Sequence, residues 1–323
     1  MARIERSLAV PESMAGSRLD QALARLLPEF SRARLQKWIR AGCVEVDEEL
    51  VTLPRQRLAG GETVRLETAL PEETLLAPEP IALDIRYEDE QLLVVNKPAG
   101  LVVHPAPGHP SGTLVNALLH HDPALAALPR AGIVHRLDRD TTGLLVVARS
   151  LGAHHALVEQ LQARSVQREY LALVQGELTA GGTVEAAIGR HPVDRKRMAV
   201  REVGGREAVT HYRIARRLEG FTLLRVRLET GRTHQIRVHM ASIRHPVVGD
   251  PVYGGRPRFP AGLAMAARAT LEAFRRQALH AARLAFEHPA TSERIEVHAE
   301  LPEDFAHLLE VLKEAGPAVE RGA

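Results

Sequence analysis

The N-terminal part of the chain places its hydrophobic positions at helical spacing. Two amphipathic helices are predicted, and their apolar faces carry Leu19, Leu23, Leu26, Leu27, Leu35, Trp38 and Ile39. Gly42 can end the second helix in a left-handed cap. Two short strands are predicted next, at residues 44–46 and 63–67. The pattern therefore predicts a compact helix-helix-hairpin module over residues 14–72.

A stretch rich in proline and acidic side chains follows this module. Residues 71–90 hold seven acidic residues and one arginine, and Pro71, Pro78 and Pro80 interrupt them. This composition is typical of an extended linker, which we place at residues 73–84.

Short apolar runs and alternating segments predict the strands of a larger domain over residues 85–315. The expected strands are 92–95, 143–149, 169–175, 209–216, 221–229, 279–286 and 294–298, and the expected helices are 111–119, 152–164 and 302–315. The strands come in clusters without regular alternation with helices, which argues against a doubly wound parallel sheet. We expect an α+β fold with a mixed, mainly antiparallel sheet, and a flexible tail at 316–323.

Composition narrows the class of protein. The chain has 323 residues, enough for two domains, and 45% of them are hydrophobic. A single cysteine, Cys43, cannot form an internal disulfide or a cysteine metal cluster. No apolar run approaches the length of a membrane span, and the N-terminus is too charged for a signal peptide. We therefore expect a cytoplasmic enzyme.

The placement of charge is more informative than the net charge of +2. Only four of the 42 basic residues are lysines, and arginine suits phosphates and splayed bases, although a GC-rich genome also enriches arginine. Residues 31–40 hold four basic residues and no acid, and residues 190–217 hold nine basic residues and three acids. This distribution indicates two nucleic-acid contacts joined by the acidic linker.

One segment combines an unusual set of residues: His135-Arg136-Leu137-Asp138-Arg139-Asp140-Thr141-Thr142-Gly143-Leu144-Leu145. The segment is too apolar for an ordinary surface loop, and Thr141 to Gly143 predict a turn between two buried strands. A carboxylate at such a junction loses water and needs a partner. Asp138 is therefore a candidate for chemistry, and the alternative is a structural aspartate that caps the turn.

The eleven-residue string resembles the signature of the pseudouridine synthases that act on ribosomal and transfer RNA, in the branch whose motif reads His-Arg-Leu-Asp. Three further blocks share this resemblance, at residues 97–104, 168–172 and 228–239. The resemblance extends over residues 85–315. The N-terminal module resembles the RNA-binding module named after ribosomal small-subunit protein four, through Arg18-Leu19-Asp20, residues 31–35 and Gly60-Gly61-Glu62.

The family resemblance implies an isomerase that flips a uridine out of its stack and reattaches the base through carbon 5. It makes Asp138 the catalytic carboxylate, as a nucleophile or as a base at the neighbouring ribose carbon; Asp140 is the rival, ranked second by the family match alone. Arg136 would fill the gap left by the flipped base, Tyr170 would stack on the target ring, and Arg237 would pair with Asp138 and keep it ionised.

The resemblance also implies the partners. Arg32, Arg34, Lys37 and Arg40 would grip RNA phosphates. Combined with the string 249–255, the motifs are most similar to family members that modify 23S ribosomal RNA, which suggests the helix 69 stem-loop, in free RNA or a large-subunit assembly intermediate. We expect a monomer and no cofactor. We also expect no bound metal, because the histidines lack metal-ligand spacing. The alternative is a non-catalytic RNA-binding or ribosome-assembly factor, which would not need Asp138, Tyr170 and Arg237 together.

Overall fold

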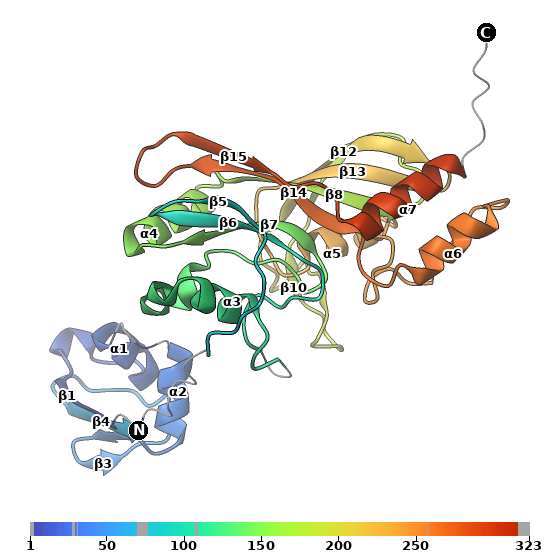
Figure 1. Cartoon of the computed structure of the whole chain (residues 1–323). Helices are drawn as coiled ribbons and strands as arrows, with labels where there is room; N and C mark the ends of the chain where they lie inside the picture. The colour runs from blue at the N-terminus through green and yellow to red at the C-terminus, as the bar shows by residue number, and fades with distance from the viewer. Residues whose placement is uncertain are drawn as a thin grey trace, which may run out of the picture. The chain divides into compact units, whose positions relative to one another are not determined.

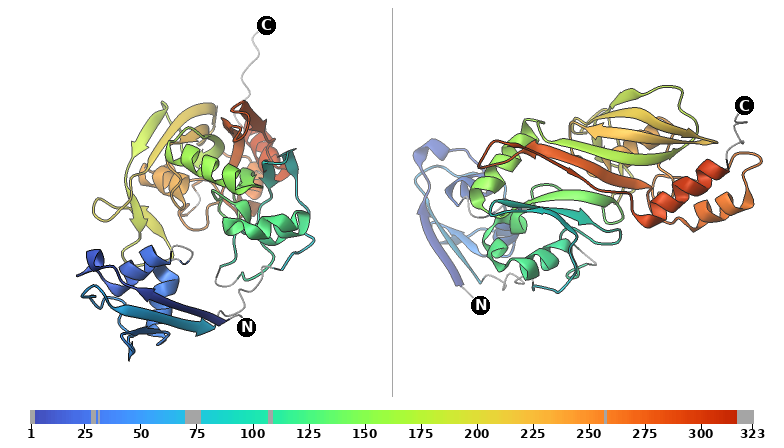
Figure 2. Two further views of the ribbon diagram at one scale, coloured as in Figure 1. Left: turned by 90° about the vertical axis from the view of Figure 1, so that its left-hand side faces the viewer. Right: turned by 45° about the horizontal axis from the view of Figure 1, so that its top comes forward.

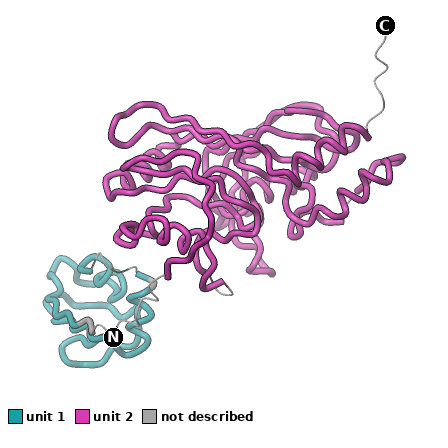
Figure 3. The backbone as a smooth tube through the Cα atoms, viewed as in Figure 1, with its two compact units in different colours: residues 1–76 teal, residues 77–323 magenta. Residues whose placement is uncertain are grey.

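The computed structural model describes residues 3–27, 30, 32–69, 77–106, 109–256 and 258–315. It divides into two compact units, residues 1–76 and 77–323 (Figures 1 and 3). The tail expected at 316–323 and residues 73–76 of the expected linker lie outside the described residues. The rest of that linker packs on the second unit, where Asn116 and Ala77 hydrogen-bond and Glu79 accepts from the backbone N–H of Gly112.

The first unit is a four-stranded antiparallel sheet with two helices. Its elements are β1 (Arg3–Ala9), α1 (Leu19–Leu26), α2 (Arg32–Arg40), β2 (Val44–Val46), β3 (Glu49–Leu50) and β4 (Thr63–Ala69), and the strand order is β1-β4-β2-β3. Leu19, Leu23, Leu35 and Ile39 form its fully buried centre. The predicted helix-helix-hairpin is confirmed, and β1, which pairs along the whole of β4, was not predicted.

The second unit is built on a nine-stranded sheet. In chain order its strands are β5 (Ile85–Glu88), β6 (Leu92–Lys97), β7 (Thr142–Ala148), β8 (Gln167–Gln175), β9 (Gly182–Glu185), β12 (Val209–Leu218), β13 (Phe221–Leu228), β14 (Leu279–Glu287) and β15 (Arg294–His298). The order across the sheet is β5-β6-β7-β14-β8-β13-β12-β9, and β15 also pairs with β14. Of the pairs between these strands, only β7 with β14 is parallel. The mixed, mainly antiparallel sheet is therefore confirmed.

The sheet forks at β14. One edge of β14 pairs with β8 over most of its length. The other edge is shared, because β7 pairs with His280 and Ala281 and β15 pairs with residues 283–287. β7 therefore diverges from the sheet shortly after its first residues, next to the segment that carries Asp138.

Helices pack around the sheet, and one of them is the last described element of the chain. They are α3 (Leu114–His121), α4 (Leu151–Gln162), α5 (Gln235–Ser242), α6 (Met265–Ala273) and α7 (Glu303–Glu314). Ala153 and Leu157 of α4 pack on the apolar side chains of β6 and β7, and Figure 2 shows this helix across the strands. A two-stranded hairpin of β10 (Ile188–Arg190) and β11 (Met198–Val200) packs on α5. Within the described part of the chain, no helix is long and apolar enough to cross a membrane.

One local expectation was wrong. The described residues 134–141, which precede β7, form a loop and not the first of two buried strands. The imidazole of His135 explains the difference, because its Nε2 accepts the backbone N–H of Val146 at 3.1 Å. A side chain thus satisfies an N–H that a paired strand would otherwise have bound.

Candidate active site

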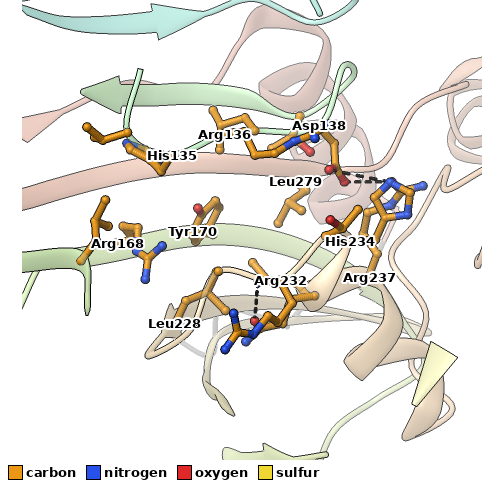
Figure 4. A pocket seen from close by; sticks show the side chains of 18 of the residues that line it. His135, Arg136, Asp138, Arg168, Tyr170, Leu228, Arg232, His234, Arg237 and Leu279 are labelled. Carbon is orange, nitrogen blue, oxygen red and sulfur yellow. Dashed lines mark hydrogen bonds and ion pairs between the residues drawn. The ribbon is translucent and has the colours of Figure 1, made fainter. Parts of the chain in front are cut away.

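The loop before β7, strand β8 and the start of α5 enclose a cavity of about 550 Å³ in the second unit (Figure 4). Asp138, Tyr170, Arg237 and Arg136, which the sequence placed in four roles, all line it. A cavity of this size is typical of small-ligand sites. The fold therefore brings together residues that are up to about 100 positions apart in sequence.

Asp138 is held by one of its two carboxylate oxygens. The Nη1 of Arg237 donates to Oδ2 at 2.9 Å, so the expected ion pair is present. Oδ1 lies 3.8 Å from Nε2 of His234 and accepts no hydrogen bond from the described residues. The side chain is 16% exposed. Arg237 thus fixes the carboxylate while one oxygen remains available to a substrate.

Arg237 bridges two carboxylates. Its Nε and Nη2 donate to Asp250 at 2.7 and 2.8 Å, which leaves Nη1 for Asp138. Burial lowers the pKa of Arg237, but the hydrogen bonds and charge of Asp250 and Asp138 outweigh it and raise the pKa above its ordinary value. Asp250 also accepts from the backbone N–H groups of Val252 and Tyr253. The guanidinium is therefore permanently charged and rigidly oriented.

His234 lies between Tyr253 and Asp138. Its Nδ1 lies 2.8 Å from Tyr253 Oη, which also accepts the backbone N–H of Met198 at 2.9 Å. Its Nε2 lies 3.8 Å from Oδ1 of Asp138. Burial lowers the pKa of His234, which favours the neutral ring. Like His135, His234 thus connects loop residues through a hydrogen bond of its side chain.

Tyr170 lies on β8 and is only 6% exposed. Burial raises the pKa of its hydroxyl, the charge of Arg168 opposes that rise, and the charge of Asp138 adds to it. The phenol is therefore neutral at physiological pH. Leu228 and Leu279 line the cavity beside it, so this part of the site is apolar and suits a flat ring.

Lys97 holds the loop that carries Asp138 through hydrogen bonds to backbone carbonyls. Its buried ammonium donates to the backbone carbonyls of Pro98, Leu101 and Arg139, at 2.7, 3.0 and 2.7 Å. Burial lowers the pKa of Lys97 to about 7, although Asp140 and Asp138 oppose that change. Three carbonyl acceptors require the ammonium form, because a neutral amine has only two N–H groups.

The rival carboxylate lies elsewhere. Asp140 is not among the residues that line the cavity, and it pairs with the exposed Arg139 at 3.1 Å. The geometry thus favours Asp138 over Asp140 as the acid that a bound ligand would meet.

The side chain of Arg136 lines the cavity and is exposed.

The basic candidates of the first unit have different surroundings. Lys37 and Arg40 are exposed on α2, and the guanidinium of Arg34 lies 5.9 Å from the centre of the Trp38 ring. Arg32 instead donates twice to the buried carboxylate of Asp20, which also binds Arg18. Arg32 therefore has a structural partner that sequence reasoning did not foresee.

Sequence reasoning gave no role to several residues of the site, namely Lys97, Arg168, Asp250 and Tyr253. Their motifs were noticed, but a buried partner of Arg237 cannot be identified before the fold brings residue 250 to α5.

Comparisons with known proteins extend over both units. A family model described as RNA pseudouridylate synthase matches residues 91–242, and an S4 domain model matches residues 17–64. The chain is 56% identical over 309 residues to the ribosomal large subunit pseudouridine synthase D of Xanthomonas campestris, covering 96% of this chain and 93% of the relative. It is 52% identical to the protein of the same name from Escherichia coli strain K12, covering 96% and 95%. The structure of human RNA Pseudouridylate Synthase Domain Containing 4 matches with a TM-score of 0.56 and 28% identity, over 71% of this chain and 92% of that chain.

Proposed function

This chain belongs to the RNA pseudouridine synthase family, and on that premise we propose that it isomerises specific uridines of 23S ribosomal RNA with Asp138 as the catalytic carboxylate. The observation that carries the proposal is the geometry of Asp138 in the cavity. One oxygen is fixed by a charged arginine, the other accepts no hydrogen bond from the described residues, and the side chain lines the cavity.

The proposed RNA target rests on the relatives. Two proteins that are identical to this chain at more than half of the aligned residues are named as ribosomal large subunit enzymes. We extend this to the helix 69 stem-loop, in free RNA or an assembly intermediate, as the sequence motifs imply. The S4 domain supports an RNA partner, and Lys37 and Arg40 on α2 are exposed for phosphate contacts. The protein would act as a monomer in the cytoplasm.

The reaction needs each part of the site. The target uridine leaves its stack, which costs a few kcal/mol, and Arg136 at the cavity would occupy the vacated position. The ribose C1′ would then lie beside Oδ1 of Asp138, and the ring would stack on Tyr170. Asp138 either attacks C1′ or removes the proton at C2′, and in both routes the C1′–N1 bond breaks. The base then rotates and C5 bonds to C1′. In the first route the bond between Asp138 and C1′ breaks at this step, and in the second route Asp138 returns the proton to C2′. C5 then loses its proton and N1 gains one, so the product is an isomer of uridine.

Tritium release from carbon 5 of uridine-labelled 23S ribosomal RNA tests this function. We expect release by the wild type, none by Asp138→Asn, and near-normal release by the matched control Asp140→Asn. Circular dichroism would establish that both variants fold. Release by Asp138→Asn but not by Asp140→Asn would transfer the catalytic role to Asp140. The absence of release by the wild type, with RNA binding retained, would overturn the proposed substrate.

A further inference from the structure

Arg168 is a buried charge in the cavity without a partner in the described protein. Arg168 is only 7% exposed, and its Nε atom is fully buried and makes no hydrogen bond. Its guanidinium forms no ion pair with any described carboxylate, in contrast to Arg237, which binds two. Burying an unpaired charge is costly, and buried polar groups in native proteins are almost always satisfied. The exception indicates that a ligand completes this part of the site.

The surroundings leave space for this guanidinium. A Cβ atom at Gly231 would lie 2.8 Å from Nη1 of Arg168, so a side chain at position 231 would displace the guanidinium. Gly231 and Arg168 both line the cavity although they lie on different segments.

Arg168 and Tyr170 project from the same face of β8, because alternate residues of a strand share a face. The pKa of Tyr170 responds in opposite directions to Arg168 and to Asp138. Both charges therefore lie near its ring, and Figure 4 shows Tyr170 between them. A uridine with its ribose at Asp138 and its ring on Tyr170 would extend its carbonyl edge toward Arg168.

We propose that Arg168 binds the carbonyl edge of the target uracil and stabilises the negative charge of the base after it leaves the ribose. This inference rests on the proposed function. When the C1′–N1 bond breaks, its electron pair stays on the base, and the resulting anion spreads over N1, O2 and O4. The guanidinium donates hydrogen bonds to a carbonyl oxygen and transfers no proton. The charge disappears when C5 bonds to C1′, and the later loss of the C5 proton is balanced by the gain of a proton at N1.

Such an interaction acts on the rate more than on binding. The neutral uracil of the bound substrate gains little from a cation, whereas the detached anion gains much from a buried one beside the apolar Leu228 and Leu279. An RNA phosphate is the other anion that could reach an arginine. The burial of Arg168 near the apolar side chains of Leu228 and Leu279 favours the base over a phosphate.

Two substitutions test the role by separate routes. Arg168→Met removes the charge. Gly231→Ala keeps the charge, but its added methyl group displaces the guanidinium of Arg168. We expect each to lower the single-turnover rate by about 100-fold, with the dissociation constant for RNA changed less than about threefold. Arg168→Lys should recover part of the rate. Arg225→Met removes an exposed arginine from β13 and serves as the matched control with a normal rate.

Modified RNAs identify the anion. With 5-fluorouridine at the target, the more acidic base leaves more easily, so the defect of Arg168→Met should shrink; consumption of 5-fluorouridine in nucleoside digests measures it. With a neutral methylphosphonate on either side of the target, the defect should persist. A defect that vanishes with the methylphosphonate would assign Arg168 to a phosphate and overturn the proposal.

Two more outcomes would overturn it: a normal rate in Arg168→Met, or a loss confined to RNA affinity. A wild type that modifies none of these RNAs would contradict the proposed substrate and not the role of Arg168, so the two failures are distinguishable.

Discussion

Arg237 is the residue on which two carboxylates depend. It separates the charges of Asp138 and Asp250 while being almost fully buried, with a side chain that is 5% exposed. A single cation between two anions leaves one negative charge in the site, which is the state that a nucleophile or base requires.

Removing Arg237 should therefore damage both stability and catalysis. We expect Arg237→Met to lower the free energy of unfolding by about 3 kcal/mol, because the buried Asp250 and the partly buried Asp138 lose their counterion, and to abolish tritium release. Adding Asp250→Asn should restore part of the stability, since one uncompensated charge disappears, but no activity. Urea unfolding of both variants measures this. A double variant no more stable than the single one would contradict the bridging role.

The lowered pKa of Lys97 predicts that the reaction rate falls on the alkaline side of its pH profile. Its pKa is lowered from 10.5 to about 7, so the ammonium is present below neutral pH and loses its proton as the pH rises. The neutral amine can serve only two of its three carbonyls, and the loop of Asp138 loosens. The single-turnover rate should fall as the pH rises above about 7. Lys97→Met should be about 10- to 100-fold slower at pH 6.5 and lack this fall; a fall that is unchanged in the variant would belong to another group.

At the scale of elements, the sequence was most informative where burial is one-sided or complete. The apolar run 92–95 lies within β6, every residue of β7 is buried, and the alternation of 221–229 matches the exposed Arg225 and Arg227 of β13. Helix α5 was not predicted, because it is buried around its circumference and has no apolar stripe; Gln235, Arg237 and His239 are as buried as its aliphatic residues. Strands β9, β10 and β11 are three or four residues long, too short for a recognisable period.

The pairing of α1 with α2 depends on Asp20. Its carboxylate, on α1, is fully buried and accepts from Arg18, which precedes α1, and from Arg32 and Gln36 of α2. Burial raises the pKa of Asp20, but these hydrogen bonds outweigh it and leave the pKa lowered, so the group is ionised at neutral pH.

Asp20→Ala should therefore destabilise the first unit. Because Arg32 is 43% exposed and partly screened, we expect a loss of about 2 kcal/mol, below the range for fully buried pairs. RNA affinity should weaken as α2 shifts. Glu49→Ala, on the exposed strand β3, is the control and should leave both quantities unchanged. Equal stability of the two variants in chemical denaturation would refute this account of the helix pair.

At the scale of the whole molecule, the second unit contains several histidines whose burial favours the neutral side chain. Burial is the largest cause that lowers the pKa of His135 to about 3 and of His104 to about 4, and it lowers the pKa values of His239 and His280 in the same direction. Well above pH 6.5 these side chains are neutral in both the folded and the unfolded chain. Between pH 6.5 and about 4, His135 and His104 take up protons mainly in the unfolded chain, so acid favours unfolding.

Stability should consequently fall as the pH drops below 6.5. His135 alone should account for about 1 kcal/mol at pH 5.5 relative to pH 7.5. His135→Gln keeps an acceptor for Val146 and should lose less stability over this interval than the wild type. Melting temperatures at the two pH values measure the difference; an equal drop in both proteins would exclude His135 as a source.

The position of β14 has a consequence for how the protein is made. This strand lies between β7 and β8, yet its residues, 279–287, are synthesised more than 100 positions after both. During translation the first unit can fold early as a unit of its own, whereas the cavity has no complete wall until Leu279 of β14 has left the ribosome. A chain interrupted before that point would carry an RNA-binding domain without chemistry, and could occupy the RNA that the finished enzyme is meant to modify.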